Sequence, residues 1–202
     1  MINLPFGVDV DNLIDNVRNF SWEAADILLY YSNVIKNSEQ KIEILKNENI
    51  NAPVTLADLE VNEFIIKKIN QKYQGVDWQI LSEENFKKNS KYYDNNAEWT
   101  WVLDPLDGTK DFIQGTGNYA MHLALNHKRK PFMGVVLIPE KNELWISQGE
   151  KLWCERRDGS IRKQNLSETN VLKEMTIVTS KNHRNQKLND LIEKINFKKT
   201  II

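Results

Sequence analysis

The chain has 202 residues, of which 41% are hydrophobic, and its net charge at pH 7 is −1. This length supports one sizeable hydrophobic core or two small ones. The near-neutral charge gives no reason to expect a nucleic-acid polymer or an anionic membrane as a partner. A single cysteine, Cys154, excludes an internal disulfide and fits a reducing compartment.

No apolar run approaches the roughly 18 residues that a membrane-spanning helix requires. The first residues, Met1 to Pro5, lack the basic and apolar regions of a signal peptide. We therefore expect no membrane span and a cytoplasmic location.

Two helices are predicted in the first third of the chain. Residues 8–35 carry apolar side chains at helical spacing and predict a long amphipathic helix. Residues 40–46 alternate weakly and predict a short edge strand. A second helix is predicted from Thr55 to about residue 72, because Thr55 followed by Asp58 is typical of a helix start with an acidic residue in its first turn. Taken alone, Asp58 is explained as a helix-end charge.

A strand is predicted over residues 76–82, and it ends in Glu83 and Glu84. Without further context, this pair fits a solvated acidic strand end equally well. In an extended strand the two side chains would lie on opposite sides of the pleat. Residues 86–97 are polar and predict an exposed loop or lid.

Residues 99–112 form the most informative stretch, because an apolar strand stops there at Asp104 and Pro105. Carboxylates at the end of a buried strand are costly unless something pairs with them. A hard divalent cation such as magnesium binds carboxylate and carbonyl oxygens. Asp104, the Leu106 carbonyl and Asp107 could reach one such centre. The alternative is a plain Asp-Gly turn, which needs no second aspartate three positions earlier.

The remaining chain predicts a series of strands and one more helix. A layered α/β fold is therefore expected, with helices packed on a mostly antiparallel sheet. Residues 1–147 should form an N-terminal metal-binding domain and residues 148–202 an incomplete second α/β domain. The elements expected after residue 112 are strands at 119–126, 132–138, 142–147 and 175–179, a hairpin at 150–165, a helix at 185–195 and the start of a strand after residue 197.

The D-P-L-D-G-T string from Asp104 to Thr109 resembles the metal motif of the inositol monophosphatase superfamily of magnesium-dependent, lithium-sensitive phosphatases. Its continuation, Lys110-Asp111-Phe112, is similar to the branch that hydrolyses adenosine 3′,5′-bisphosphate, the CysQ-like 3′(2′),5′-bisphosphate nucleotidases of sulfur assimilation. That branch usually has glutamate where Asp111 stands. The resemblance implies a sugar-phosphatase-like α+β sandwich.

The resemblance also implies roles for named residues. Glu83, Asp104, the Leu106 carbonyl and Asp107 would be metal ligands, for two or three magnesium ions in the full-length family. Asp58, which lies in the family's V-T-x-x-D pattern, would pair with Thr109 to orient the attacking water.

The substrate contacts are expected around the same motif. The phosphate would lie among Glu83, Leu106 and Asp107, and the amides of Gly108 and Thr109 could bind its oxygens if they open a helix.

Family members commonly continue beyond this length, with a Trp-Asp dipeptide that completes the second metal site. This sequence has no Trp-Asp pair, so we expect it to stop inside the second domain with that site incomplete.

The expected function is hydrolysis of the 3′-phosphate of adenosine 3′,5′-bisphosphate to AMP and phosphate by a metal-activated water. The alternatives are an inositol monophosphatase-type sugar phosphatase and an inactive metal- or nucleotide-binding fragment. A homodimer is left open. A serine or cysteine hydrolase is disfavoured because the three histidines are scattered without a paired nucleophile.

Overall fold

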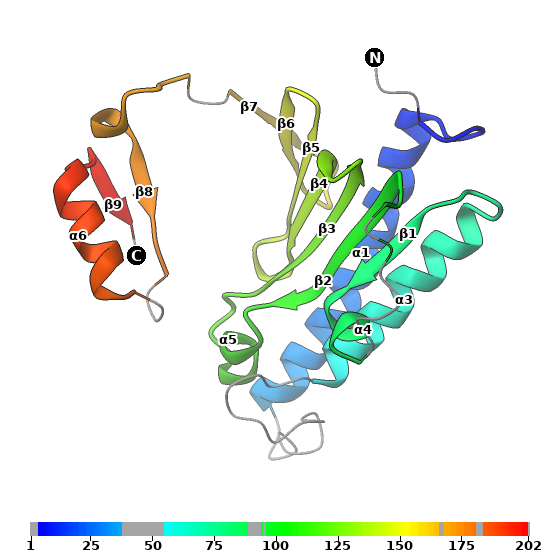
Figure 1. Ribbon diagram of the computed structural model, residues 1–202. Coiled ribbons are helices and arrows are strands. Elements are labelled where there is room, and N and C mark those ends of the chain that lie inside the picture. Colours follow the sequence, from blue (N-terminus) through cyan, green and yellow to red (C-terminus); the bar gives the residue numbers. More distant parts are fainter. Residues whose placement is uncertain are drawn as a thin grey trace. The chain divides into compact units, whose positions relative to one another are not determined.

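The structure is a computed structural model that describes residues 4–37, 55–88, 94, 96–165, 168–180 and 184–201. The chain divides into two units, Met1–Gln164 and Asn165–Ile202, which are described separately. The first unit contains one seven-stranded sheet whose strands follow one another in sequence order (Figure 1). Its strands are β1 (Gln79–Ser82), β2 (Trp99–Asp107), β3 (Ala120–His127), β4 (Lys130–Ile138), β5 (Glu143–Gln148), β6 (Lys151–Glu155) and β7 (Ile161–Gln164).

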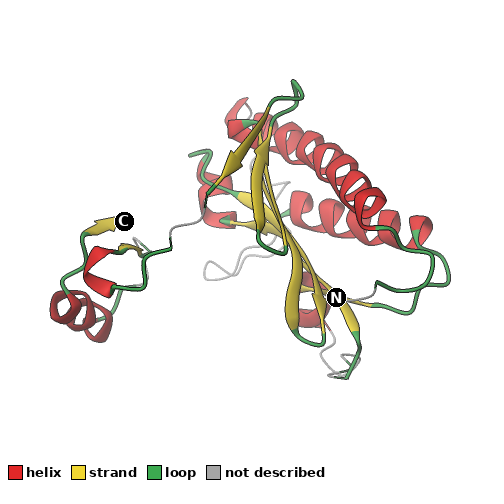
Figure 2. Ribbon diagram, turned by 90° about the horizontal axis from the view of Figure 1, so that it is seen from above, coloured by secondary structure: helices red, strands yellow, loops and turns green. Residues whose placement is uncertain are grey.

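The predicted fold class is confirmed, because the sheet is mostly antiparallel and carries helices. Strands β1 and β2 run parallel, whereas every later neighbour pair in this sheet is antiparallel. The two long helices, α1 (Val10–Asn37) and α3 (Leu56–Lys72), lie along the same face of the sheet (Figure 2). One face of the sheet is therefore covered by helices within this unit.

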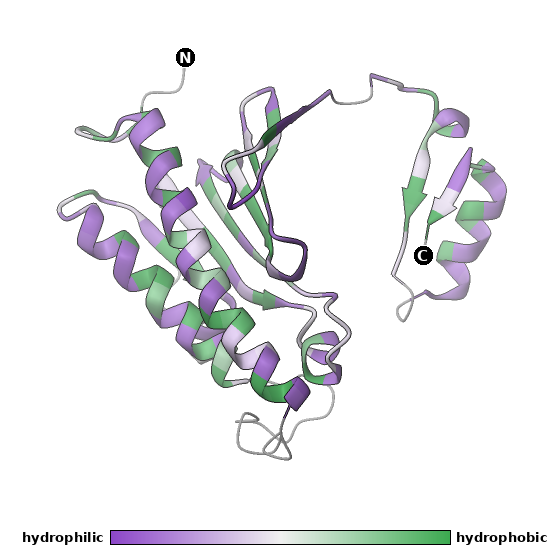
Figure 3. Cartoon of the chain, turned by 180° about the vertical axis from the view of Figure 1, so that it is seen from behind, coloured by the Kyte–Doolittle hydropathy of each residue, from purple (hydrophilic) through white to green (hydrophobic). Residues whose placement is uncertain are grey.

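The hydrophobic core lies between these helices and the covered face of the sheet. Along β3 every second residue is buried, as expected for a strand with one face on the core. Both helices alternate hydrophobic and hydrophilic residues (Figure 3), so each can bury one face and expose the other. The large side chains that are almost fully buried include Trp101, Leu103, Met121, Leu123, Leu13 and Ile65.

Several predicted elements agree closely with the observed ones. α3 begins after Thr55, which forms a capping box with Asp58, and α1 extends two residues beyond the predicted end, to Asn37. β1 is shorter than predicted and starts at Gln79. The edge strand expected at 40–46 lies outside the described residues.

The boundary between the two units differs from the prediction. It falls after Gln164, not after residue 147. The hairpin expected at 150–165 forms as β6 and β7, but β6 pairs along its length with β5, so that Trp145 faces Cys154. The sequence predicted the β6–β7 hairpin, but it did not predict that β6 would pair with the preceding strand β5 and so join the sheet of the first unit.

The second unit is a small β–α–β arrangement. β8 (Thr176–Val178) pairs in parallel with β9 (Lys199–Ile201), and α6 (Gln186–Ile195) connects them. Asn185 caps α6 by accepting a hydrogen bond from the Leu188 amide at 3.0 Å. None of the helices in the described part of the chain has the length and apolar character of a membrane span.

A partly buried ion pair ties α1 to β6. The Arg18 guanidinium donates to Glu155 through Nε and through Nη2, the latter at 2.9 Å, and the Trp153 indole donates to the same carboxylate at 2.6 Å. The Glu155 side chain is only 6% exposed. Burial by itself would raise the pKa of Glu155, but the hydrogen bonds from Arg18 and Trp153 outweigh it and lower that pKa below its ordinary value of 4.5.

Replacing Arg18 with methionine should lower the free energy of unfolding by about 2 kcal/mol at pH 7, because the carboxylate stays buried without its cation. This value is below that of a fully buried pair, since Arg18 is partly exposed. A carboxyl whose folded pKa is lowered stabilises the protein above its unfolded pKa and loses that contribution as the pH falls. Urea denaturation should therefore show the difference shrinking below about pH 4. A difference that is constant with pH would contradict this explanation.

Candidate active site

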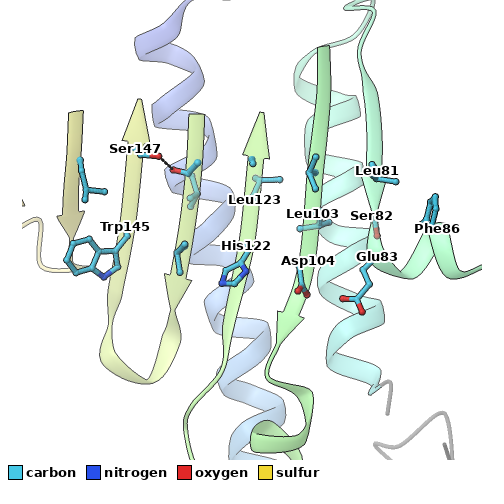
Figure 4. Close-up of a pocket in the computed structure, with 16 residues that line it drawn as sticks. Leu81, Ser82, Glu83, Phe86, Leu103, Asp104, His122, Leu123, Trp145 and Ser147 are labelled. Atoms are coloured by element: carbon cyan, nitrogen blue, oxygen red, sulfur yellow. Dashed lines mark hydrogen bonds between the residues drawn. The ribbon is translucent and has the colours of Figure 1, made fainter. Parts of the chain in front are cut away.

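Two acidic side chains meet where the parallel strands β1 and β2 approach their carboxyl ends. Ser82, the last residue of β1, pairs with Leu103 of β2. The residues that follow these two, Glu83 and Asp104, therefore lie at the same edge of the sheet. The two carboxylates lie side by side (Figure 4) and are close enough to share a hydrogen bond. The parallel pairing therefore brings together two of the three predicted metal-binding carboxylates.

This proximity perturbs the ionisation of Asp104. The pKa of Asp104 is raised to about 7, most strongly by burial and further by the charge and hydrogen bond of Glu83 and by the charge of Asp107. The Leu106 amide, which donates to Asp104 Oδ1 at 3.2 Å, opposes the shift. A cation bound between two such carboxylates offsets their mutual repulsion when both are ionised. Carboxylate oxygens are the ligands that hard ions such as Mg²⁺ and Ca²⁺ prefer. The donor set thus fits a divalent metal.

Asp107 lies next to the pair, but it does not complete a three-carboxylate cage. Its side chain is 61% exposed and lies 3.9 Å from Nε2 of His122. Among the described residues, no three histidine, cysteine, aspartate or glutamate side chains form a ready metal cluster. His122, which pairs with Asp104 across β2 and β3, was not among the residues predicted from the sequence. The alternation of side chains along β3 could have identified His122 only if the pairing register between β2 and β3 had been known.

The path of the chain between these residues differs from the prediction at Pro105. The strand was expected to stop there, but β2 continues to Asp107. Asp104 faces His122 and Asp107 faces Ala120, so the pairing register shifts across Pro105. Proline lacks a ladder donor and is tolerated at such an irregularity.

A second pair of predicted site residues, Asp58 and Thr109, meets at the start of α3. Asp58 is 3% exposed and accepts hydrogen bonds from the Thr55 amide at 2.8 Å and the Thr55 hydroxyl at 2.5 Å. Its other oxygen, Oδ1, lies 3.5 Å from the Thr109 hydroxyl. Asp58 therefore acts both as the acidic residue in the first turn of α3, within the capping box that Thr55 begins, and as a partner of Thr109, the predicted catalytic threonine.

The surroundings of Asp58 also include Glu84. The pKa of Asp58 is raised to about 6, because burial and the charge of Glu84 raise it by more than the Thr55 hydrogen bonds lower it. Glu84 is 4% exposed. The prediction that Glu83 and Glu84 lie on opposite sides of an extended strand was wrong. The strand has already ended at this point, and Glu83 is the first residue of a helix, α4 (Glu83–Lys88).

Gly108 places Thr109 at the start of the short helix α5 (Thr109–Gln114). Its φ is 85°, and a Cβ at this position would lie 2.7 Å from the Asn118 carbonyl oxygen. Only glycine fits such a left-handed and crowded position. The Thr109 hydroxyl also donates to the Leu106 carbonyl at 3.1 Å, and Lys110 is exposed.

The carboxylate pair opens onto a groove on the sheet face that α1 and α3 leave free (Figure 4). The groove has a volume of about 620 Å³ and is mainly apolar. Its lining includes Val102, Ala124, Val136, Trp145 and Phe86, with His122 and Ser147 among the polar side chains.

Several known proteins resemble this chain in sequence or in fold. The sequence matches the inositol monophosphatase family over residues 9–201. It is 29% identical to the 3′(2′),5′-bisphosphate nucleotidase CysQ of Buchnera aphidicola over 72% of the chain and 52% of the relative. It is 25% identical to the CysQ of Escherichia coli K12 over 91% of the chain and 69% of the relative. The chain thus spans about half to two thirds of these relatives.

Solved structures with the same fold include a staphylococcal IMPase-II, with a TM-score of 0.67 and 19% identity over 94% of this chain and 64% of that one. Another is an IMPase/NADP phosphatase complexed with NADP and Ca²⁺, with a TM-score of 0.70 and 17% identity over 96% and 67%. At these identities the likeness shows the fold alone. Because the family match covers nearly the whole sequence, the chain belongs to the inositol monophosphatase family.

Proposed function

We propose that the protein is a metal-dependent phosphomonoesterase that removes the 3′-phosphate of adenosine 3′,5′-bisphosphate, giving AMP and phosphate. The observation that carries this proposal is the position of the Thr109 hydroxyl, between Asp58 at 3.5 Å and the Leu106 carbonyl at 3.1 Å. The buried pair is thereby linked to the motif that contains Asp104. The nucleotide substrate is supported by the similarity to CysQ proteins.

In this proposal, one group of residues binds the metal and another orients the attacking water. Glu83, Asp104, Asp107 and the Leu106 carbonyl would hold magnesium. When bound, the metal supplies positive charge that neutralises phosphoryl oxygens and lowers the pKa of a water. The single hydroxyl proton of Thr109 can be donated either to the Leu106 carbonyl or to the Asp58 carboxylate. If the Leu106 carbonyl held the metal, the proton would go to Asp58, and the lone pairs of the hydroxyl oxygen would be free to accept a hydrogen bond from that water. The water is thus oriented toward phosphorus.

The second candidate is an inositol monophosphatase-type activity on a sugar phosphate. It is favoured by the family match itself and by a solved structure of the same fold bound to inositol monophosphate. A cytoplasmic role in sulfur assimilation is part of the first proposal, whereas inhibition by lithium is expected of either activity.

Phosphate release from both substrates, measured with magnesium and with a chelator, separates these candidates. We expect kcat/KM for adenosine 3′,5′-bisphosphate to exceed that for inositol monophosphate by at least tenfold, about 1.4 kcal/mol. The reverse preference would assign the sugar-phosphatase activity. Binding of magnesium without phosphate release from either substrate would identify a metal-binding fragment.

A further inference from the structure

A buried polar link lies beneath the carboxylate pair. Ser82, which is fully buried, donates its hydroxyl proton to Oδ1 of Asn62, which is 4% exposed. The Asn62 amide in turn donates to Asn85 Oδ1 at 3.3 Å. Asn62 therefore contacts the residue before Glu83 and the second residue after it.

The position of Asn62 on α3 makes this link part of the site. Asn62 follows Asp58 by one helical turn, so both side chains project from the same face of the helix. Asp58 contacts Thr109, whereas Asn62 contacts the start of α4. One buried face of α3 thus reaches both halves of the candidate site.

The hydrogen bonds among Ser82, Asn62 and Asn85 can hold Glu83 in place, which apolar packing at the same positions would not do as specifically. Two carboxylates held within hydrogen-bond reach repel each other when ionised, and this repulsion favours rotation of Glu83 away from Asp104. Burying a polar side chain lowers the stability of the fold unless the side chain is hydrogen-bonded. Two apolar side chains would fill the same space without needing hydrogen bonds. Asn62 instead forms hydrogen bonds to the side chains of Ser82 and Asn85, which flank Glu83 on both sides in the sequence.

We propose that Asn62 and Ser82 are positioning residues that fix the start of α4, so that Glu83 stays beside Asp104 and the two can bind a divalent cation together. The proposal rests on the proposed function only in taking Glu83 as a metal ligand. Hydrogen-bonding partners behind metal ligands commonly change metal affinity by about 10- to 100-fold when they are replaced.

The test compares Ser82→Ala and Asn62→Leu with the wild type by calorimetric titration of magnesium in the absence of substrate. The matched control is Ser21→Ala, because Ser21 is also fully buried and donates its hydroxyl proton at 2.7 Å, but to the Val17 carbonyl within α1. Each variant is first checked for folding by circular dichroism and thermal unfolding without metal. We expect magnesium affinity to fall at least tenfold in Ser82→Ala and Asn62→Leu and to stay within twofold of the wild type in Ser21→Ala.

Ser82→Ala removes a single oxygen atom, so it remains a valid test if Asn62→Leu does not fold. The proposal is overturned if Ser82→Ala is folded and binds magnesium as tightly as the wild type, or if Ser21→Ala weakens binding equally. If magnesium affinity falls as expected but the wild type releases no phosphate, the proposed function fails and the positioning role stands. A wild type that binds no divalent cation would overturn both.

Discussion

Replacing Asp104 with asparagine should reduce phosphate release by about a thousandfold while making the metal-free protein more stable. Asparagine keeps the size of the side chain but removes the negative charge that would hold the cation. Metal stabilisation of phosphoryl oxygens is worth several kcal/mol, and about 4 kcal/mol corresponds to three orders of magnitude in rate. The measurements are kcat/KM with saturating magnesium and magnesium affinity by calorimetry.

The metal-free D104N variant is expected to be more stable than the wild type because the pKa of Asp104 is raised to about 7 from the ordinary 3.8. A carboxyl with a raised folded pKa loses stability as the pH rises from its unfolded pKa to its folded pKa, since the unfolded state then ionises more readily. In the absence of metal, the D104N variant should therefore unfold with a free energy on the order of 1 kcal/mol higher than the wild type at pH 8. This figure allows for solvent screening of the partly exposed carboxyl.

The same variant has an internal control in its pH dependence. The stability difference should vanish below about pH 3, where Asp104 is protonated in both the folded and the unfolded state. It should reverse when magnesium is added to the wild type at pH 8. Asp26→Asn, which changes an exposed carboxylate of α1, should alter neither activity nor this pH dependence. Equal metal-free stability of D104N and wild type at every pH would show that Asp104 and Glu83 do not repel each other.

Removing the Thr109 hydroxyl should lower kcat by about a hundredfold and leave magnesium affinity unchanged. The positioned hydroxyl orients the attacking water, and positioned groups that handle protons contribute about 10²- to 10⁴-fold. Thr109→Ala deletes this group, while Thr109→Ser keeps the oxygen that lies near Asp58. Serine should restore most of the activity, because only a methyl group is lost.

Thr116→Ala offers a matched control for this experiment. The Thr116 hydroxyl donates to the Asp111 carboxylate at 2.7 Å, so it forms a similar threonine–aspartate pair at the other end of α5. Its removal should leave kcat nearly unchanged. If Thr116→Ala lowers kcat as much as Thr109→Ala, the effect comes from the stability of α5 and not from an oriented water.

Local sequence signals predicted much of the fold. The Thr55–Asp58 capping box and the helical spacing that follows it located α3, because helix propensity and caps act within a few residues. The alternation of apolar and polar residues likewise located β3, and the run from Asp104 to Thr109 marked the candidate site. These features depend on neighbouring residues and are therefore readable from the chain.

The tertiary structure alone decided how distant residues meet. The parallel pairing of β1 with β2 brought Glu83 beside Asp104, and the register of β3 placed His122 near Asp107. The start of α4 at Glu83 buried Glu84, against the prediction from a continued strand. The pairing of β6 with β5 moved the unit boundary past residue 147. The β1–β2 and β2–β3 pairings join residues that are well separated in the sequence, and no local pattern encodes their register.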